Sequence, residues 1–116
     1  MLIGVQGTKK FNDYPVFLRA MGTAMSMREP DDKEIIVYAF GPYQINAMAQ
    51  EFVNVTERSL KARGIRIKIY KMSHGWAKKN ITKFGYFAFF SKPKEPVSEI
   101  VDIADAKNID VGVYRY

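Results

Sequence analysis

The segment from Glu34 to Val53 constrains the fold more than any other part of the chain. It opens with the apolar run Glu-Ile-Ile-Val-Tyr-Ala-Phe, breaks at Gly41-Pro42, and continues with apolar residues three or four positions apart. A run of strand length, a turn and an amphipathic helix together make half of a βαβ unit. In open α/β sheets, ligands bind where such strands end and helix N-termini begin.

The rest of the chain repeats this alternation of strand and helix patterns. We expect strands at residues 1–7, 34–40, 65–70, 84–90 and 109–114. We expect helices at residues 16–25, 45–63, 77–83 and 97–108. Asp13 is placed to cap the first helix, and Gly64 to end the second in the left-handed conformation. The pattern predicts a single domain that spans residues 1–116.

The periodicity of the apolar residues orders the strands in the sheet. The first, second and fourth strands are unbroken apolar runs, which is typical of strands covered by helices on both faces. The third and fifth strands alternate apolar and polar residues, which is typical of edges. With right-handed crossovers, these positions give the order 3-2-1-4-5. The expected fold is therefore α/β: a Rossmann-like three-layer α/β/α architecture with five mostly parallel strands.

Composition narrows the classes of function. The chain has no cysteine and one histidine, so a zinc site built from these residues is excluded. Ser73 and His74 are adjacent, which does not suit a nucleophile and its base, and no glycine-rich phosphate-loop pattern is present. The net charge of +6 favours anions, but the basic residues are scattered, so nucleic acid is a weaker expectation than a small anion. Without a leader or a membrane-length apolar run, we expect a cytoplasmic protein and no membrane partner.

Three loops are expected to meet at the carboxyl edge of the sheet: Gly7–Lys10, Gly41–Gln44 and Ser91–Pro96. Lysines and free N–H groups there suit a phosphate, and amide side chains suit a sugar or a base. The same glycines are also compatible with sharp turns alone, and the lysines with solvated charges. The candidate ligand-binding residues are Gly7, Thr8, Lys9, Gly41, Pro42, Gln44, Asn46, Lys78, Lys79 and Asn80. No catalytic or metal-ligating residues are assigned.

Three segments resemble one known family. Residues 7–14, Gly-Thr-Lys-Lys-Phe-Asn-Asp-Tyr, resemble the Gly-Ser-Arg-x-Phe-x-Asp-Tyr opening of the YspA-like branch of the SLOG superfamily. Residues 40–46 are similar to that branch's Gly-Gly-Ala-x-Gly-Val-Asp segment, and residues 78–80 lie where it carries an Arg-Asn pair. The resemblance implies a Rossmann-like sheet, often dimeric, that binds a nucleotide or an NAD-derived ligand. SLOG relatives include nucleoside-phosphate glycosidases, sensors of NAD-derived signals and single-strand DNA binders of the DprA type.

The chain departs from the family at residues that matter for catalysis. Asn46 replaces an aspartate, Gln44 replaces a glycine, and the glycosidase Pro-Gly-Gly-x-Gly-Thr-x-x-Glu motif retains only Glu99. The glycines of that motif are replaced by Lys92, Pro93 and Glu95. Because those glycines let the backbone wrap a phosphate closely, their loss argues against hydrolysis. We therefore expect a nucleotide-binding module without strong catalysis; any residual activity would be that of a nucleoside-phosphate glycosidase.

Two other functions are compatible with the sequence. A protein-interaction module with a degenerate pocket is suggested by the lost glycines and by Tyr114 and Tyr116, which are expected to be exposed. Single-strand nucleic-acid binding of the DprA type would use the lysines together with stacking on Trp76. A homodimer and a protein partner both stay open at this point.

Overall fold

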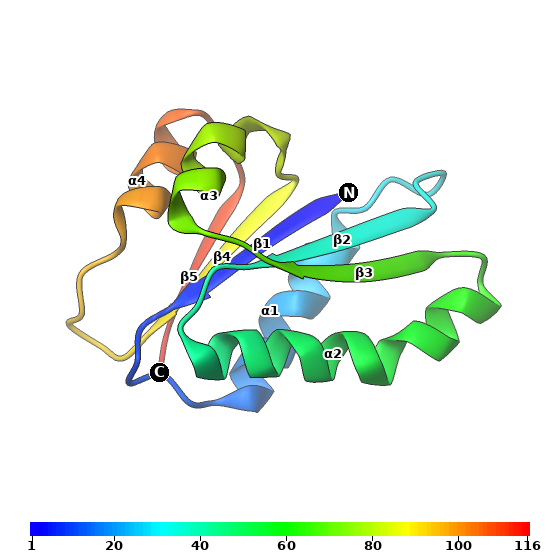
Figure 1. Ribbon diagram of the computed structural model, residues 1–116, viewed down its shortest axis with the longest axis horizontal. Coiled ribbons are helices and arrows are strands. Elements are labelled where there is room, and N and C mark those ends of the chain that lie inside the picture. Colours follow the sequence, from blue (N-terminus) through cyan, green and yellow to red (C-terminus); the bar gives the residue numbers. More distant parts are fainter.

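All five strands of the sheet are parallel, and they lie in the order β3-β2-β1-β4-β5 (Figure 1). The computed structural model describes residues 1–116. The strands are β1 (Leu2–Gly7), β2 (Glu34–Ala39), β3 (Arg66–Lys71), β4 (Tyr86–Ser91) and β5 (Val111–Arg115). The predicted Rossmann-like α/β fold and strand order are confirmed, with β3 and β5 at the two edges.

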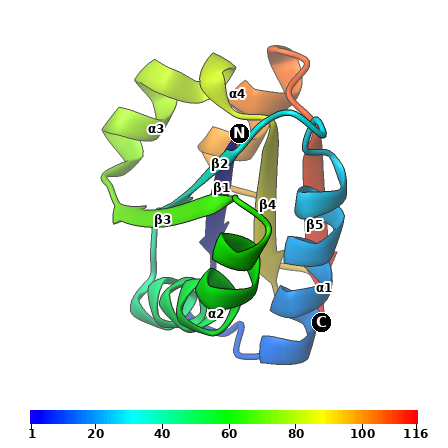
Figure 2. The ribbon, with the colours of Figure 1, turned by 90° about the vertical axis from the view of Figure 1, so that its right-hand side faces the viewer.

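Helices cover both faces of the sheet, so the molecule has three layers (Figures 1 and 2). The helices are α1 (Tyr14–Ser26), α2 (Tyr43–Ala62), α3 (His74–Asn80) and α4 (Glu99–Ala106), with a short 3-10 turn η1 (Ile81–Lys83) after α3. One core lies under α1 and α2, and a smaller one lies under α3 and α4. No helix is both long enough and apolar enough to cross a bilayer.

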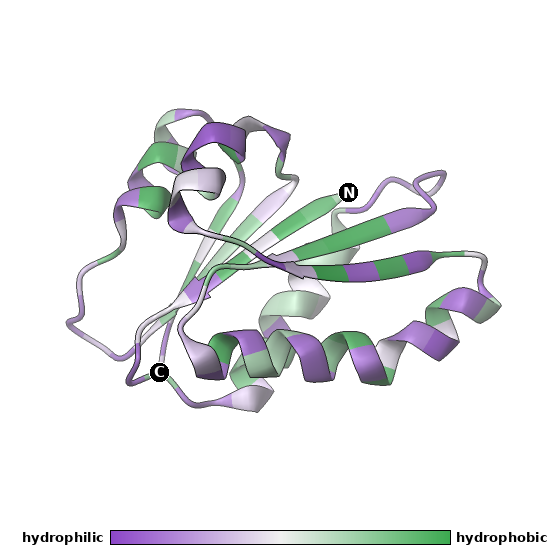
Figure 3. Ribbon diagram, in the orientation of Figure 1, coloured by the Kyte–Doolittle hydropathy of each residue, from purple (hydrophilic) through white to green (hydrophobic).

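The burial of strand β4 on both faces explains why its sequence is a run of mostly aromatic residues. All six of its residues are buried. Phe87 and Phe89 enter the smaller core, whereas Tyr86, Ala88 and Phe90 enter the core under α1 and α2. Successive side chains of a strand point to opposite faces, and here both faces are covered by helices. Edge strand β3 instead alternates hydrophilic and hydrophobic residues (Figure 3).

The ends of the helices follow local chemistry and differ from the predicted ends by one to three residues. Asp13 caps α1 by accepting a hydrogen bond of 3.1 Å from the backbone N–H of Val16, as predicted. Helix α3 begins at His74, three residues earlier than predicted, because the Ser73 hydroxyl accepts the N–H of Trp76 at 3.2 Å. Helix α4 is shorter than the predicted range 97–108. The earlier start of α3 changes which residues reach the carboxyl edge.

Candidate functional site

A cleft of about 290 Å³ opens at the carboxyl edge of the sheet, where β1 and β2 end. It is lined by Gly7, Thr8, Lys9, Phe40, Gly41, Pro42 and His74. Helix α2 starts directly after one of these lining residues, Pro42, and α3 starts at another, His74. The cleft therefore combines two loops and two helix starts, which is the arrangement expected at a ligand site of an open α/β sheet.

The N-terminus of α2 leaves hydrogen-bond donors unpaired at the rim of the cleft, next to the lining residue Pro42. Its N-cap residue is Pro42, which makes no side-chain capping bond, and the first turn contains no acidic residue. The backbone N–H groups of Tyr43 and Gln44 have no acceptor in the chain, and neither does that of Lys9. These donors, the positive end of a 20-residue helix and the Lys9 ammonium all favour an anion.

Two of the predicted ligand-binding residues use their polar atoms to hold the loops together. The Gln44 side-chain amide donates to the backbone carbonyl of Lys9. The Asn46 side-chain oxygen accepts the N–H of Gly41 at 2.8 Å, and the carbonyl of Gly41 accepts the N–H of Gly7 at 3.1 Å. Gln44 and Asn46 therefore shape the rim of the cleft, and neither lines it.

His74 fastens the start of α3 to the end of β2. Its Nε2 lies 2.8 Å from the carbonyl oxygen of Phe40 and 3.2 Å from Nε2 of Gln6, a buried residue in β1. Because a carbonyl only accepts, the contact with Phe40 favours the tautomer that carries its proton on Nε2. Nδ1 then remains an acceptor without a partner in the chain. With this tautomer, the Gln6 amide must turn its oxygen toward Nε2 of His74 and its nitrogen toward Ser98. The Ser98 hydroxyl can donate or accept, so it pairs with the Gln6 amide in either orientation.

On the other side of β1, the carboxylate of Glu95 accepts hydrogen bonds from the donors that follow β1 and β4. The Oε1 atom of Glu95 accepts the Thr8 hydroxyl at 2.7 Å and the N–H of Lys92 at 2.6 Å. Arg115 donates to the backbone carbonyl of Glu95 and to the Ser91 hydroxyl. The Glu95 carboxylate thus bridges the loops that follow β1 and β4, and the Thr8 hydroxyl is already paired. The open part of the carboxyl edge is the half between β1 and β2.

The pKa of Glu95 gives a direct test of this closure. The Thr8 hydroxyl, followed by the N–H of Lys92, holds the pKa of the Glu95 carboxyl below its usual value. Since the folded-state pKa is depressed, the stabilisation is present at neutral pH and is lost as the pH falls through that pKa. We expect Thr8→Val to raise the pKa of Glu95 toward its usual value in a carboxyl NMR titration. Thr23→Val, in the middle of α1, should leave it unchanged, and equal effects of both substitutions would contradict the closure.

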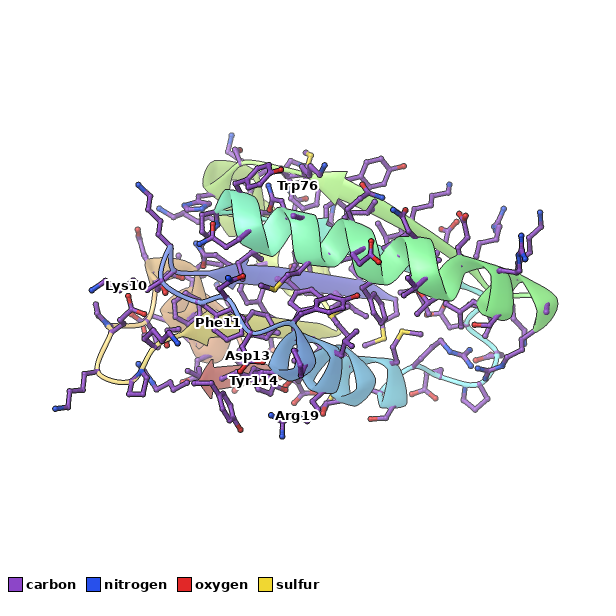
Figure 4. The ribbon with its side chains drawn as sticks, turned by 90° about the horizontal axis from the view of Figure 1, so that it is seen from below. Lys10, Phe11, Asp13, Arg19, Trp76 and Tyr114 are labelled. Carbon is purple, nitrogen blue, oxygen red and sulfur yellow. The ribbon has the colours of Figure 1, made fainter.

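Phe11 anchors the loop that carries Thr8 and Lys9. Its ring is fully buried and lies 5.0 Å from the ring of Phe90, between centroids. Lys10, the preceding residue, is exposed and projects at the end of the molecule beside the loop that follows β4 (Figure 4). The two lysines before Phe11 therefore lie in different surroundings. Lys9 lines the cleft, whereas the charge of Lys10 helps to lower the pKa of Glu95.

The predicted residues on the third helix lie outside the cleft. Lys78 forms an ion pair of 2.7 Å with Glu99, at the start of α4. Asn80 donates to a backbone carbonyl of its own helix, and Lys79 is exposed. Because α3 starts at His74, these three residues occupy its last turn, more than one turn from the carboxyl edge. We predicted that they close the site; the structure brings none of them to the cleft, and the α3 residue that lines it is His74.

Sequence reasoning missed Gln6 and Ser98 as site residues and gave no role to His74. One signal was available: Gln6 is the only polar side chain in the apolar strand β1, and it stands at the carboxyl end. A polar residue in such a place needs partners when it is buried. The structure describes no cluster of three or more acidic or histidine side chains that could hold a metal ion.

Comparison with protein-family models, with curated proteins and with solved structures finds no significant match to this chain.

Proposed function

We propose that the cleft binds the phosphate of a nucleotide or of a nucleotide-derived ligand such as AMP, ADP-ribose or NAD. The observation that carries this proposal is the uncapped N-terminus of α2, whose N-cap residue Pro42 lines the cleft together with Lys9. The phosphate would accept hydrogen bonds from the N–H groups of Tyr43 and Gln44, and the Lys9 ammonium would neutralise part of its charge. Nδ1 of His74 would accept a hydroxyl or amino group of the ligand.

The size of the cleft favours a small ligand of this class. Small-molecule sites usually enclose about 300–1,000 Å³, and the cleft, at about 290 Å³, lies just below that range. A mononucleotide therefore suits it better than a complete dinucleotide. The resemblance of residues 7–14 to the SLOG opening supports the same ligand class, and we propose that the chain is a SLOG-type protein.

The proposal is for binding without bond cleavage. The lining of the cleft contains no aspartate or glutamate to serve as a general acid or a nucleophile. Glu99, the one residue retained from the glycosidase motif, is paired with Lys78 between α3 and α4. These two facts favour a sensor or carrier of the ligand over a hydrolase.

Titration calorimetry with AMP, ADP-ribose and NAD tests the proposal. We expect AMP to bind, and Lys9→Ala to weaken its affinity about tenfold, the size of one charge-assisted hydrogen bond. The matched control is Lys10→Ala, which removes the same charge from the next residue along the chain. The side chain of Lys10 does not line the cleft. A protein that releases no heat with any of the three ligands, or that loses equal affinity in both variants, would contradict the proposal.

The two alternative functions gain no support from the residues that suggested them. Trp76 is stacked on Tyr38, with centroids 4.4 Å apart, so one face of its ring is not open to a base. Tyr114 is stacked on Phe90 and its hydroxyl is 2.7 Å from that of Tyr86; it is half-buried, and only Tyr116 is exposed as predicted. Single-strand binding, a homodimer and a cytoplasmic location stay predictions.

A further inference from the structure

A second and larger concavity lies far from the cleft, between the C-terminal half of α2 and the edge strand β3. Its volume is about 630 Å³. It is lined by Asn54, Glu57, Arg58, Lys61, Ile65, Arg66, Ile67 and Lys68. In Figure 1 the two elements run side by side, and β3 has no neighbour on its outer side. We refer to this concavity as the edge groove.

The open side of β3 offers unpaired backbone groups along the edge groove. Arg66 of β3 donates its N–H to Lys33, and Met72, directly after β3, donates its N–H to Ala39, so the backbone groups of the even-numbered residues point toward β2. Alternate residues of a strand direct their backbone groups to opposite sides. Ile67 and Ile69 therefore direct their N–H and C=O groups away from the sheet, where an added strand would find them.

The charge of the edge groove is positive, because four basic residues and one acidic residue, Glu57, are among those that line it. Arg58 and Lys61 stand on the α2 wall, and Arg66 and Lys68 follow the strand. Glu34 lies 3.5 Å from Arg66 and 3.7 Å from Lys68, and such exposed pairs are weak and screened by salt. Two copies of β3 would bring like charges together, which disfavours edge-to-edge pairing of this chain with itself.

A nucleic-acid strand fits the groove less well than a peptide does. No aromatic ring is among the lining residues, so bases would have no surface on which to stack. The floor is aliphatic instead, formed by the buried residues Ile65 and Ile67. An open strand edge, an aliphatic floor and cations on a flanking helix match the requirements of an extended, acidic peptide.

We propose that an extended acidic segment of a partner protein adds to β3 as a further strand of the sheet. Its backbone pairs with Ile67 and Ile69, and its carboxylates on the α2 side face Arg58 and Lys61. This site is separate from the nucleotide cleft and does not depend on the function proposed for it.

Fluorescence anisotropy tests the charge of the site. The probe is a labelled, end-blocked peptide of seven residues in which glutamate alternates with threonine and valine. We expect it to bind the wild-type protein and to lose at least tenfold in affinity to Arg58→Glu/Lys61→Glu. The matched control, Lys83→Glu/Lys107→Glu, makes the same change of charge on exposed residues outside the groove and should keep the affinity within about twofold. Equal losses in both variants would overturn the proposal.

A second peptide tests strand addition on the unaltered protein. N-methylation of alternate residues removes backbone donors without changing the charge, and we expect it to abolish binding. The unmodified peptide should slow hydrogen exchange at the amides of Ile67 and Ile69. Unchanged exchange at these amides, or equal affinity for the methylated peptide, would overturn the proposal. Tighter binding of a thymidine oligonucleotide that is lost in Arg58→Glu/Lys61→Glu would assign the groove to nucleic acid instead.

Discussion

Phe90→Ala is expected to lower the free energy of unfolding by about 3–5 kcal/mol, the usual cost of removing a buried phenylalanine ring. Phe90 is fully buried in β4. Its ring centroid lies 5.0 Å from that of Phe11, 5.1 Å from that of Phe17 and 5.3 Å from that of Tyr114. Its ring thus joins the site loop, α1 and β5. Since a domain typically has about 5–15 kcal/mol in total, the variant should be close to unfolding.

Urea denaturation followed by circular dichroism measures this loss. The control is Tyr43→Ala, which removes an aromatic ring that is 84% exposed. We expect that substitution to change the free energy of unfolding by less than about 0.5 kcal/mol. If the two variants lost similar stability, the aromatic cluster around Phe90 would not be the centre of the core.

Two glycine substitutions are expected to change stability in opposite directions. A Cβ atom on Gly4, in the central strand β1, would lie 2.5 Å from Cδ2 of Phe87 and 3.1 Å from Cε1 of Phe84. Phe87 is fully buried and stacked on Phe40, so its ring cannot move aside cheaply. We expect Gly4→Ala to lower the free energy of unfolding by about 1–3 kcal/mol through overpacking.

Gly22 provides the matched comparison. It lies in α1, and no atom other than those of its chain neighbours and the adjacent helix backbone stands within 4 Å of the position its Cβ would take. Alanine is the better helix former, so Gly22→Ala should raise the free energy of unfolding by about 0.5–1 kcal/mol. The same urea experiment compares both variants. An unchanged or raised midpoint for Gly4→Ala would mean that the Phe87 ring does not pack over Gly4.

The fold could be predicted because the burial of each strand determines which of its residues are apolar. Strand β4 is covered on both faces, and its residues are therefore apolar without interruption. The edge strand β3 is half-exposed, and its residues alternate. Gly64 has a φ of +76°, which is the conformation that a glycine after a long helix predicts. These are local patterns, and together with the handedness of crossovers they fix the order of strands.

The site could be predicted only in part, because it depends on contacts between residues distant in sequence. The loops after β1 and β2 are found from strand ends alone. The pairing of Thr8 with Glu95 joins residues 87 positions apart, and no local pattern records it. Helix α3 starts at His74 because Ser73 is its N-cap, three residues earlier than predicted. As a result His74 lines the cleft, where we had expected Lys79. Serine before a short helical run was the signal for that start.

The contacts of Glu95 occupy the place where the SLOG pattern, which the sequence resembles, has glycines. Where those glycines would let the backbone wrap a phosphate, this chain places a carboxylate that takes the N–H of Lys92 and the Thr8 hydroxyl. Under the proposed function, an anionic ligand would bind at the other half of the carboxyl edge, beside Lys9 and the start of α2.

An NMR titration of the isotope-labelled protein with AMP tests the central claim most directly, because it reports where the ligand binds. The account predicts that the backbone amides of Lys9, Tyr43 and Gln44 shift together and saturate with one binding constant, while those of Arg58 and Lys61 stay in place. Shifts confined to the edge groove, or no shifts at the amides of the cleft at saturating AMP, would contradict it.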